Sequence, residues 1–214
     1  MKNILAITAN LASCSIAILY KNKLIELNAN ANSTSHLAWL AQKFLDDNSI
    51  DPKEIDGVIT TSGPGSFTGI RAAQSFVKGF AFTLKIPAVS VSYFDVIENE
   101  FFKNFKIRKN PELIVIKNEK KQIYYRLKNS ENKSQVGVST YDISNLIPEN
   151  NNIYIVGDAI EEISPYLDKN LKKYTIVDFN KAKHLLDFSE KLFAPDPKVE
   201  TLYINASVNA SLKI

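Results

Sequence analysis

Apolar and polar positions alternate in short blocks along the first hundred residues, as expected of strands and helices that follow one another. Five blocks predict strands, at residues 4–8, 15–20, 23–28, 55–61 and 88–91. The polar pair Lys21-Asn22 predicts a tight hairpin between the second and third strands. Helical periodicity predicts a helix that ends near residue 47 after possible N-caps at residues 32–35, a helix over 67–84, and a helix from Ser92 to about residue 102.

The second half of the chain repeats this style more loosely. Strands are expected at residues 112–117, 122–127, 135–141, 152–156 and 174–177, and helices from about 158 to 167 and over 181–193. Strands interleaved with helices predict an α/β fold with a partly parallel sheet. The Asn- and Lys-rich stretch 102–110 is the best boundary, between an N-terminal lobe at residues 1–104 and a smaller C-terminal lobe at 105–214. Two such halves are compatible with a duplicated fold.

Two helices of the first lobe have more apolar surface than one sheet can cover. The first places Leu37, Leu40, Ala41 and Phe44 on a core stripe and sends Trp39, the only tryptophan, to a polar face. The second has one stripe of Ile70, Ala73, Val77, Phe80 and Leu84 and another of Ala72, Phe76 and Gly79. These faces favour a protein partner, with Trp39 as an anchor; the alternative is that a loop of the same chain covers Trp39.

A glycine-rich turn joins a predicted strand to the second of these helices. Residues 61–71 read TSGPGSFTGIR and hold three of the seven glycines of the chain. Ser66 or Thr68 can cap the helix, and Arg71 lies one turn into it, able to pair with a phosphate or a carboxylate. The sequence matches neither G-x-G-x-x-G nor the P-loop. A capped tight turn and an anion-binding loop are therefore both open.

Composition narrows the class of protein. Cys14 is the only cysteine, which excludes an intrachain disulfide, and it lies in a strand-like run as a small buried hydrophobe. The net charge is +3, and nearly all of the positive charges are lysines rather than the arginines that nucleic-acid sites favour. The basic groups around residues 103–109 and 169–173 are therefore interpreted as solvated faces rather than a tight RNA site. No apolar run approaches a membrane span, and polar Thr8 and Asn10 interrupt the apolar N-terminus; we expect a cytoplasmic protein.

Catalytic groups are scarce. The turn after the first strand, residues 8–13, has neither the Asp nor the Gly that would organise Mg²⁺ and phosphate. The two histidines are His36 and His184, and position 40, one turn beyond His36, is leucine, so no metal-binding pair forms. Nothing orients either histidine toward Ser66 as a catalytic set. This profile predicts a pseudo-enzyme with no catalytic or metal-binding residue of its own.

Residues 63–71 (GPGSFTGIR) resemble the signature of the TsaB family, also called the YeaZ family, accessory subunits of the bacterial tRNA threonylcarbamoyladenosine synthase. The match extends to residues 4–7, Cys14-Ser15, His36, Glu200 and Tyr203, and is faint over most of the second half. The resemblance implies a two-lobed actin/hexokinase-like (ASKHA) fold. Typical members of the family that this chain resembles have a sequence like Asp-Thr-Ala at the place where this chain has Thr8-Ala9-Asn10. This departure argues further against autonomous nucleotide binding.

The resemblance also implies partners and sites. It implies a non-catalytic scaffold that activates a catalytic paralogue of TsaD type, joined by an ATPase subunit of TsaE type, and a homodimer when the chain is alone. tRNA would be bound only through the complex, no cofactor by this chain alone, and ATP and a divalent metal by the partner subunits. The expected partner-binding residues are His36, Trp39, Leu40, Lys43, Phe67, Ile70, Ala73, Gln74 and Val77. The expected loop or anion-binding residues are Gly63, Gly65, Ser66, Thr68, Gly69 and Arg71.

Three rival functions stay open. A self-contained homodimeric regulator would use the same helical surface, and sequence does not separate it from the scaffold. An autonomous actin-like kinase is disfavoured by the carboxylate-free turn at residues 8–13. A peptidase is disfavoured because the chain has neither a metal-binding histidine pair nor a recognisable catalytic triad.

Overall fold

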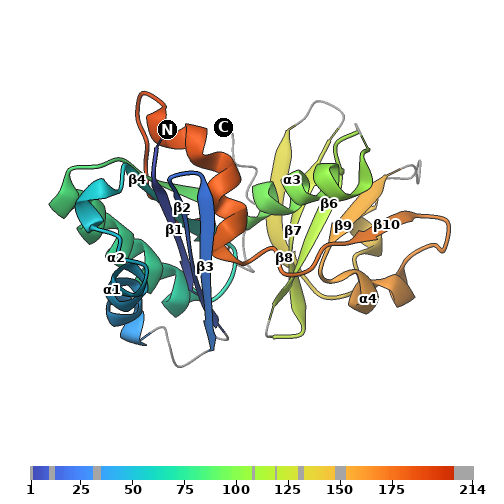
Figure 1. Ribbon diagram of the computed structural model, residues 1–214. Coiled ribbons are helices and arrows are strands. Elements are labelled where there is room, and N and C mark those ends of the chain that lie inside the picture. The colour runs from blue at the N-terminus through green and yellow to red at the C-terminus, as the bar shows by residue number, and fades with distance from the viewer. Residues whose placement is uncertain are drawn as a thin grey trace. The chain divides into compact units, whose positions relative to one another are not determined.

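The computed structural model describes residues 2–9, 13–30, 35–107, 109–118, 120–129, 133–147 and 153–204. The chain divides into two compact units, each built on a five-stranded mixed sheet (Figure 1). Unit 1 comprises Met1–Tyr93 and Asn180–Leu202, and unit 2 comprises Phe94–Phe179 and Tyr203–Ile214. Among the described residues, no helix combines the length and the apolar character that crossing a membrane requires.

The sheet of unit 1 has the strand order β3-β2-β1-β4-β5. Its strands are β1 (Ile4–Ala9), β2 (Ser13–Tyr20), β3 (Lys23–Asn30), β4 (Gly57–Gly63) and β5 (Ala88–Ser92). The first three are antiparallel, and β4 and β5 continue the sheet parallel to β1. Lys21 and Asn22, both with positive φ, form the predicted tight turn between β2 and β3.

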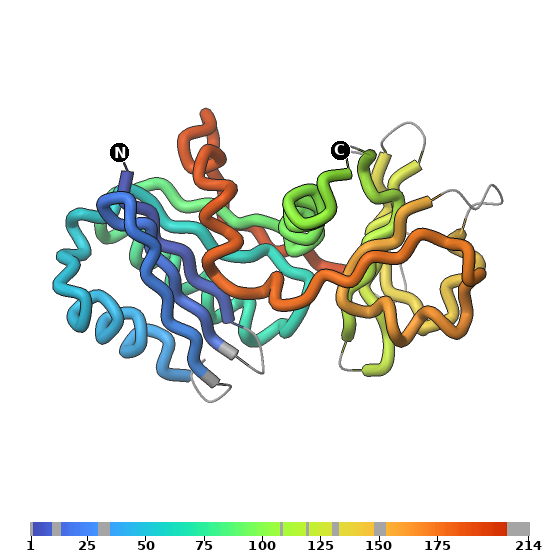
Figure 2. Tube along the Cα trace, turned by 45° about the vertical axis from the view of Figure 1, so that its right-hand side comes forward, coloured from blue at the N-terminus to red at the C-terminus, as the bar shows by residue number. Residues whose placement is uncertain are grey.

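Helical layers cover both faces of this sheet. On one face α1 (Leu37–Asp47) and α2 (Phe67–Leu84) pack against the side chains of β1 and β2 in a single apolar core. On the other face lies the 3₁₀ segment η5 (Ala182–Phe193), which returns from the C-terminal part of the chain (Figure 2). Its residues Ala182, Leu185 and Leu192 are buried. Because both faces are covered, every residue of β1 is buried, as expected for a central strand with a continuous apolar run.

The sheet of unit 2 has the order β10-β9-β6-β7-β8. Its strands are β6 (Leu113–Asn118), β7 (Gln122–Lys128), β8 (Ser134–Ser139), β9 (Tyr154–Gly157) and β10 (Lys172–Thr175). α3 (Tyr93–Phe105) packs on it from residue 94 onward, through the Phe101 ring and through Arg126 of β7, which bonds to Asp95 and Glu98 of the helix. The remaining elements are short: η2 (Pro52–Glu54), η3 (Ser144–Leu146), α4 (Ile160–Ile163) and η4 (Ser164–Tyr166).

The predicted boundary at residues 104/105 differs from the observed division. α3 was expected to complete the first lobe, but all of it after Tyr93 belongs to unit 2. Residues 180–202 were expected in the second lobe but belong to unit 1. The reason is packing: each sheet is covered by the helical segment that follows the last strand of the other sheet. A boundary drawn from local composition does not detect such an exchange.

Most predicted elements are confirmed, with boundaries shifted by one or two residues. The predicted strand 55–61 is β4 (Gly57–Gly63), since residues 52–54 form the turn η2. The helix expected to reach residue 167 ends as α4 at Ile163, because Pro165 lacks the N–H that continues a helix. The helix expected over 181–193 is 3₁₀ in type and kinked at Phe188. The strand expected at 174–177 is β10 (Lys172–Thr175).

Candidate partner-binding face and glycine-rich loop

The glycine-rich loop leads from the last residue of β4 into α2. Gly63 has φ +98°, a conformation that favours glycine, and a Cβ there would lie 3.0 Å from the Ile70 side chain. The Gly63 N–H donates to Thr61 Oγ1 at 2.9 Å. The loop is therefore held close to its own helix, and part of its glycine content follows from this close approach.

Ser66 is the N-cap of α2, as predicted. Its hydroxyl accepts from the Gly69 N–H at 3.2 Å, and its carbonyl accepts from the Ile70 N–H at 2.9 Å. Thr68, the other possible cap, is exposed on the first turn. The Ser66 cap uses one of the N–H groups that an anion at this helix end would need.

Arg71 stacks on the ring of Phe67, one turn earlier in α2. The guanidinium carbon lies 3.7 Å from the ring centroid, a cation–π contact between residues four apart. Both side chains are exposed. Arg71 thus presents its charge at the surface beside an aromatic ring, and anion binding by the loop stays a prediction.

The sequence did not predict the hydrogen-bonded segment at residues 198–202, which is bonded to β4, β5 and α2. The Ser90 N–H donates to the Lys198 carbonyl, and the Leu202 N–H donates to the Ser62 carbonyl, at 3.0 and 2.8 Å. The buried Gln74 amide of α2 donates to the carbonyls of Thr61 and Glu200, both at 2.9 Å. The Thr201 hydroxyl donates to Gln74 Oε1 at 2.6 Å. Gln74 therefore joins α2, β4 and this segment.

Four of the expected partner-binding residues face the interior of unit 1. Ile70, Ala73, Gln74 and Val77 are at most 4% exposed. Ala73 and Val77 pack in the core with α1, β1 and β2, and Gln74 makes the internal bonds just described. The prediction assigned the core stripe of α2 to the partner, and for these four residues it is wrong. The periodicity was correct, but the stripe that faces the sheet and the stripe that faces outward were not told apart.

The outward side of α1 and α2 carries large exposed aromatic rings. Trp39 is 60% exposed, Phe67 57% and Phe82 87%. The predicted exposure of Trp39 is confirmed, and a covering loop among the described residues is not observed. His36 and Lys43 are also exposed. Phe82 was missed, although its helical position, fifteen residues after Phe67, places it on nearly the same side of α2.

Between these rings the outer line of α2 consists of small residues. Thr68, Ala72, Ser75, Gly79 and Thr83 recur at intervals of three or four. Nothing lies within 4 Å of the position that a Cβ on Gly79 would occupy. A mid-helix glycine lowers helix stability by about 1 kcal/mol relative to alanine, so its presence on an open face is consistent with the close approach of another backbone.

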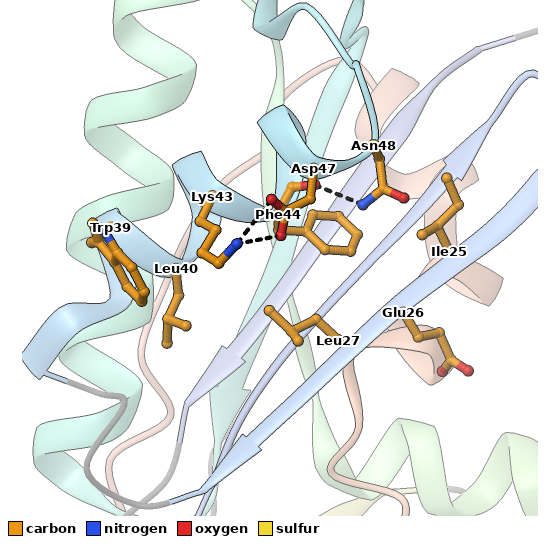
Figure 3. Close-up of a pocket in the computed structure, with 9 residues that line it drawn as sticks. All are labelled: Ile25, Glu26, Leu27, Trp39, Leu40, Lys43, Phe44, Asp47 and Asn48. Atoms are coloured by element: carbon orange, nitrogen blue, oxygen red, sulfur yellow. Dashed lines mark hydrogen bonds and ion pairs between the residues drawn. The ribbon is translucent and has the colours of Figure 1, made fainter.

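A surface pocket of about 260 Å³ lies between α1 and the outer strand β3 (Figure 3). Trp39, Leu40 and Lys43 line it, together with side chains of β3 that the sequence did not predict: Ile25, Glu26 and Leu27. Lys43 pairs with Asp47 at 2.7 Å along the helix. Half-buried aliphatic residues on an edge strand were the signal that β3 borders this face.

The polar residues near the start of the sheet are engaged within unit 1. The Thr8 hydroxyl donates to the Asn180 carbonyl, and Ser15 Oγ accepts from the Ala182 N–H, both at 2.9 Å. Burial raises the pKa of the Cys14 thiol to about 11, so the thiol is unreactive at neutral pH. Residues 10–12 of the first turn lie outside the described residues. Within the described ranges, no three His, Cys, Asp or Glu side chains are grouped to hold a metal ion.

Two five-stranded mixed sheets with helices define an α/β protein of the actin-like (ASKHA) class. Solved structures with this fold include YeaZ from Pseudomonas aeruginosa, with a TM-score of 0.70 and 18% identity over 95% of this chain and 100% of that one. A family model described as TsaD, tRNA N6-adenosine threonylcarbamoyltransferase, matches residues 27–212.

Curated relatives give the particular family. The tRNA threonylcarbamoyladenosine biosynthesis protein TsaB of Buchnera aphidicola subsp. Acyrthosiphon pisum (strain APS) is 30% identical over 177 residues, which span 81% of this chain and 73% of the relative. TsaB of Haemophilus influenzae (strain ATCC 51907 / DSM 11121 / KW20 / Rd) is 28% identical over 91 residues, 42% of this chain and 39% of the relative. The chain belongs to the TsaB (YeaZ) family.

Proposed function

We propose that this chain serves tRNA threonylcarbamoyladenosine biosynthesis as a non-catalytic scaffold that docks onto, and activates, a catalytic actin-like paralogue. The pathway follows from the TsaB relatives. The docking role rests on one observation: Trp39, Phe67 and Phe82 are exposed on two neighbouring helices of unit 1. Large exposed aromatic side chains are the usual anchors of protein interfaces.

The outer line of α2 supports a helix as the docking element. Small side chains between Phe67 and Phe82, with open space at Gly79, allow a partner helix to approach closely. The rings flank that line and supply apolar area at low entropic penalty. The same surface would serve a second copy of the chain when the paralogue is absent, so the homodimer and the heterodimer compete for one face.

The non-catalytic role is supported by the engagement of the polar groups on the first two strands. Thr8 and Ser15 are occupied by bonds to residues 180–182, and the turn between the strands carries no carboxylate. We propose that the chemistry, ATP and a divalent metal belong to the paralogue and to an ATPase subunit. The transfer of a threonylcarbamoyl group to the adenosine beside the anticodon would then occur in the cytoplasm on tRNA held by the complex.

The glycine-rich loop is proposed to shape the junction with these partners. Gly63 and Gly65 lie in the turn, and Gly69 lies on the first turn of α2. The exposed Arg71 carries a guanidinium that can bind an anion through two N–H groups. A carboxylate or phosphate of the complex would pair with Arg71 by a charge-assisted bidentate contact. The stacking of Arg71 on the Phe67 ring would help to hold the guanidinium in place for this contact.

Reconstitution tests this function. The purified chain alone should transfer no threonylcarbamoyl group and hydrolyse no ATP, and adding the paralogue and the ATPase subunit should give activity that depends on this chain. Arg71→Ala should lower that activity by about one to two orders of magnitude, and Arg71→Lys should recover only part of it. Turnover by the chain alone that a mutation in this chain abolishes would contradict the scaffold role. A paralogue that is fully active without this chain would favour the homodimeric regulator instead.

A further inference from the structure

A cluster of aromatic rings lies at one end of the unit 2 sheet, outside the site described above. Tyr154 of β9 and Tyr174 of β10 stack with centroids 5.7 Å apart at 19°. Phe101 and Phe105 of α3 meet Tyr174 edge-on at 5.1 and 4.8 Å. Phe101 is fully buried and Phe105 is exposed, so the cluster runs from the core of unit 2 to its surface. We call these four residues the Tyr154 platform.

Two lysines from distant parts of the sequence converge on this platform. Lys109 follows α3 and Lys172 begins β10, yet both ammonium groups lie over the Tyr154 ring, 5.2 and 4.9 Å from its centroid. Lys172 Nζ also donates to the Tyr154 hydroxyl at 3.4 Å. One lysine from each of the groups at residues 103–109 and 169–173, which are separate in the sequence, therefore borders the same aromatic ring.

The platform presents positive charge to solvent even where acids are near. Lys109 pairs with Glu112 at 2.6 Å, but the lysine side chain is 49% exposed and the glutamate only 21%. Glu112 also accepts from the Tyr154 N–H at 2.8 Å, which draws it inward. In this pair the ammonium is the outer partner, and Lys172 is exposed as well.

We propose that the Tyr154 platform is an RNA-contact surface that holds an unpaired segment of the tRNA within the modification complex. Aromatic rings edged by lysines match the two needs of single-stranded RNA, a stacking surface for bases and cations for phosphates. Lysine side chains are flexible enough to leave the Tyr154 ring for phosphates while a base takes their place on it. Sequence-independent contact of this kind suits a subunit that positions tRNA. The choice of tRNA as ligand rests on the proposed function.

The same sheet offers a matched control. Lys120 and Lys121 are exposed on the turn between β6 and β7. β9 is parallel to β6, with Ile155 beside Leu113, so Tyr154 lies at the start of β6 and the turn at its other end. Six strand residues separate the two ends by about 20 Å. Reversing two charges at either place changes the net charge equally, but only one place carries the platform.

The experiment measures binding of fluorescein-labelled unmodified tRNA and of an oligouridine to the full chain by anisotropy across a salt series. Lys109→Glu with Lys172→Glu should weaken binding by on the order of tenfold. The same variant should make the negative slope of log affinity against log salt shallower by about 1.4. Lys120→Glu with Lys121→Glu should change affinity by less than about twofold. Tyr154→Leu should weaken binding by about tenfold with the salt slope unchanged, because it removes stacking and not charge.

Several results would overturn the proposal: no measurable binding of RNA by the wild-type chain at low salt, equal losses in the two charge-reversed variants, or no loss in either. Tighter binding to anionic phospholipid vesicles, lost in the same platform variant, would also overturn it in favour of a membrane surface. Binding of the catalytic paralogue should be unchanged in Lys109→Glu with Lys172→Glu. If the wild-type chain binds RNA but does not bind the paralogue, the result counts against the proposed function alone. If it binds the paralogue but not RNA, the result counts against the platform alone.

Discussion

The two units share one strand order and differ in what connects the strands. Reading β3-β2-β1-β4-β5 beside β8-β7-β6-β9-β10, each sheet has three antiparallel strands and two more that run parallel to the first. Even the ends correspond, since the fourth strand of each finishes at a glycine with positive φ, Gly63 and Gly157. The sequence suggestion of two similar halves agrees with this repeated topology.

The connections have diverged. Between the third and fourth strands unit 1 has the eleven-residue α1, whereas the described part of unit 2 has the three-residue η3. Between the fourth and fifth strands the eighteen-residue α2 corresponds to the four-residue α4 and the turn η4. Among the described residues, long helices that connect two strands of the same sheet therefore exist only in unit 1; the long helix of unit 2, α3, precedes the first strand of its sheet. The difference locates the proposed docking face on unit 1 and leaves the sheet of unit 2 with a different surface, the Tyr154 platform.

The largest effect is expected from a charge placed in the unit 1 core. Val77 is fully buried, so Val77→Asp should destabilise the chain by about 3–5 kcal/mol, the penalty for an unpaired buried charge. Lys78→Asp, one position along on the exposed side, should change stability by no more than about 0.5 kcal/mol. Urea denaturation followed by circular dichroism measures both. A folded Val77→Asp variant of normal stability would mean that the stripe is an outer face, as the sequence first suggested.

The two corresponding glycines should differ in sensitivity. A Cβ at Gly157 would lie 1.8 Å from the Val115 carbonyl oxygen of the neighbouring strand, whereas the atom nearest to a Cβ at Gly63 would be the end of the Ile70 side chain, at 3.0 Å, with backbone atoms no closer than 3.6 Å. Because backbone yields less than a side-chain tip, Gly157→Ala should lower stability by about 2–4 kcal/mol and Gly63→Ala by about 1–2 kcal/mol. Denaturant midpoints measure both changes. Equal losses would show that the two strand ends are not packed differently.

Gly79 separates stability from docking. Gly79→Ala should stabilise the isolated chain by up to about 1 kcal/mol, because alanine is the better helix former and its methyl group meets nothing. The same methyl group should weaken binding of the paralogue, and Gly79→Leu should weaken it further. Thermal unfolding and calorimetric titration measure the two effects. If both variants bind the paralogue as the wild type does, no partner backbone approaches α2 at this point.

A small pH-dependent effect is expected in unit 2. Burial raises the pKa of the Asp158 carboxyl above its value in the unfolded chain, although its Oδ1 accepts from the Lys117 N–H at 2.8 Å. The folded chain therefore holds this proton to higher pH than the unfolded chain does. The contribution of Asp158 to stability is greatest below the unfolded value of about 3.9 and falls as pH rises through the folded value.

Asp158→Asn removes this titration and keeps an oxygen to accept the bond. The variant should be slightly more stable than the wild type at neutral pH. Its free energy of unfolding should also lack the decrease that Asp158 causes as the pH rises from acid to neutral. Denaturation at a series of pH values measures it. A variant that is less stable at neutral pH would show that the carboxylate is favoured by its surroundings.

Sequence patterns predicted the elements well because most of them are long and locally consistent. α2 was expected at residues 67–84 and spans Phe67–Leu84, since Ser66 caps it and Pro87 follows its end. The loop geometry at Gly63 and the exposure of Trp39 followed from local chemistry in the same way. The short pieces of unit 2 were predicted less well, because a helix such as α4 depends more on its neighbours than on its own periodicity.

Long-range packing was not predictable from one sequence. Nothing local distinguishes the inward stripe of Ala73 and Val77 from an interface stripe, since both are apolar at helical spacing. Three features join positions that are far apart in the chain. They are the exchange of α3 and η5 between the sheets, the bond from Gln74 to Glu200, and the approach of Lys109 and Lys172 to one Tyr154 ring. Such contacts are determined by tertiary structure, which a local pattern does not encode.

The most direct test of the docking face is calorimetric titration of Trp39→Ala with Phe82→Ala against the purified catalytic paralogue of the same organism. Removing two aromatic anchors should raise the dissociation constant about 100-fold or more, while the circular dichroism spectrum and unfolding midpoint stay near those of the wild type. Tyr166→Ala, which removes a 50% exposed ring from unit 2, should bind normally. A folded double variant that binds the paralogue as tightly as the wild type would contradict docking through α1 and α2.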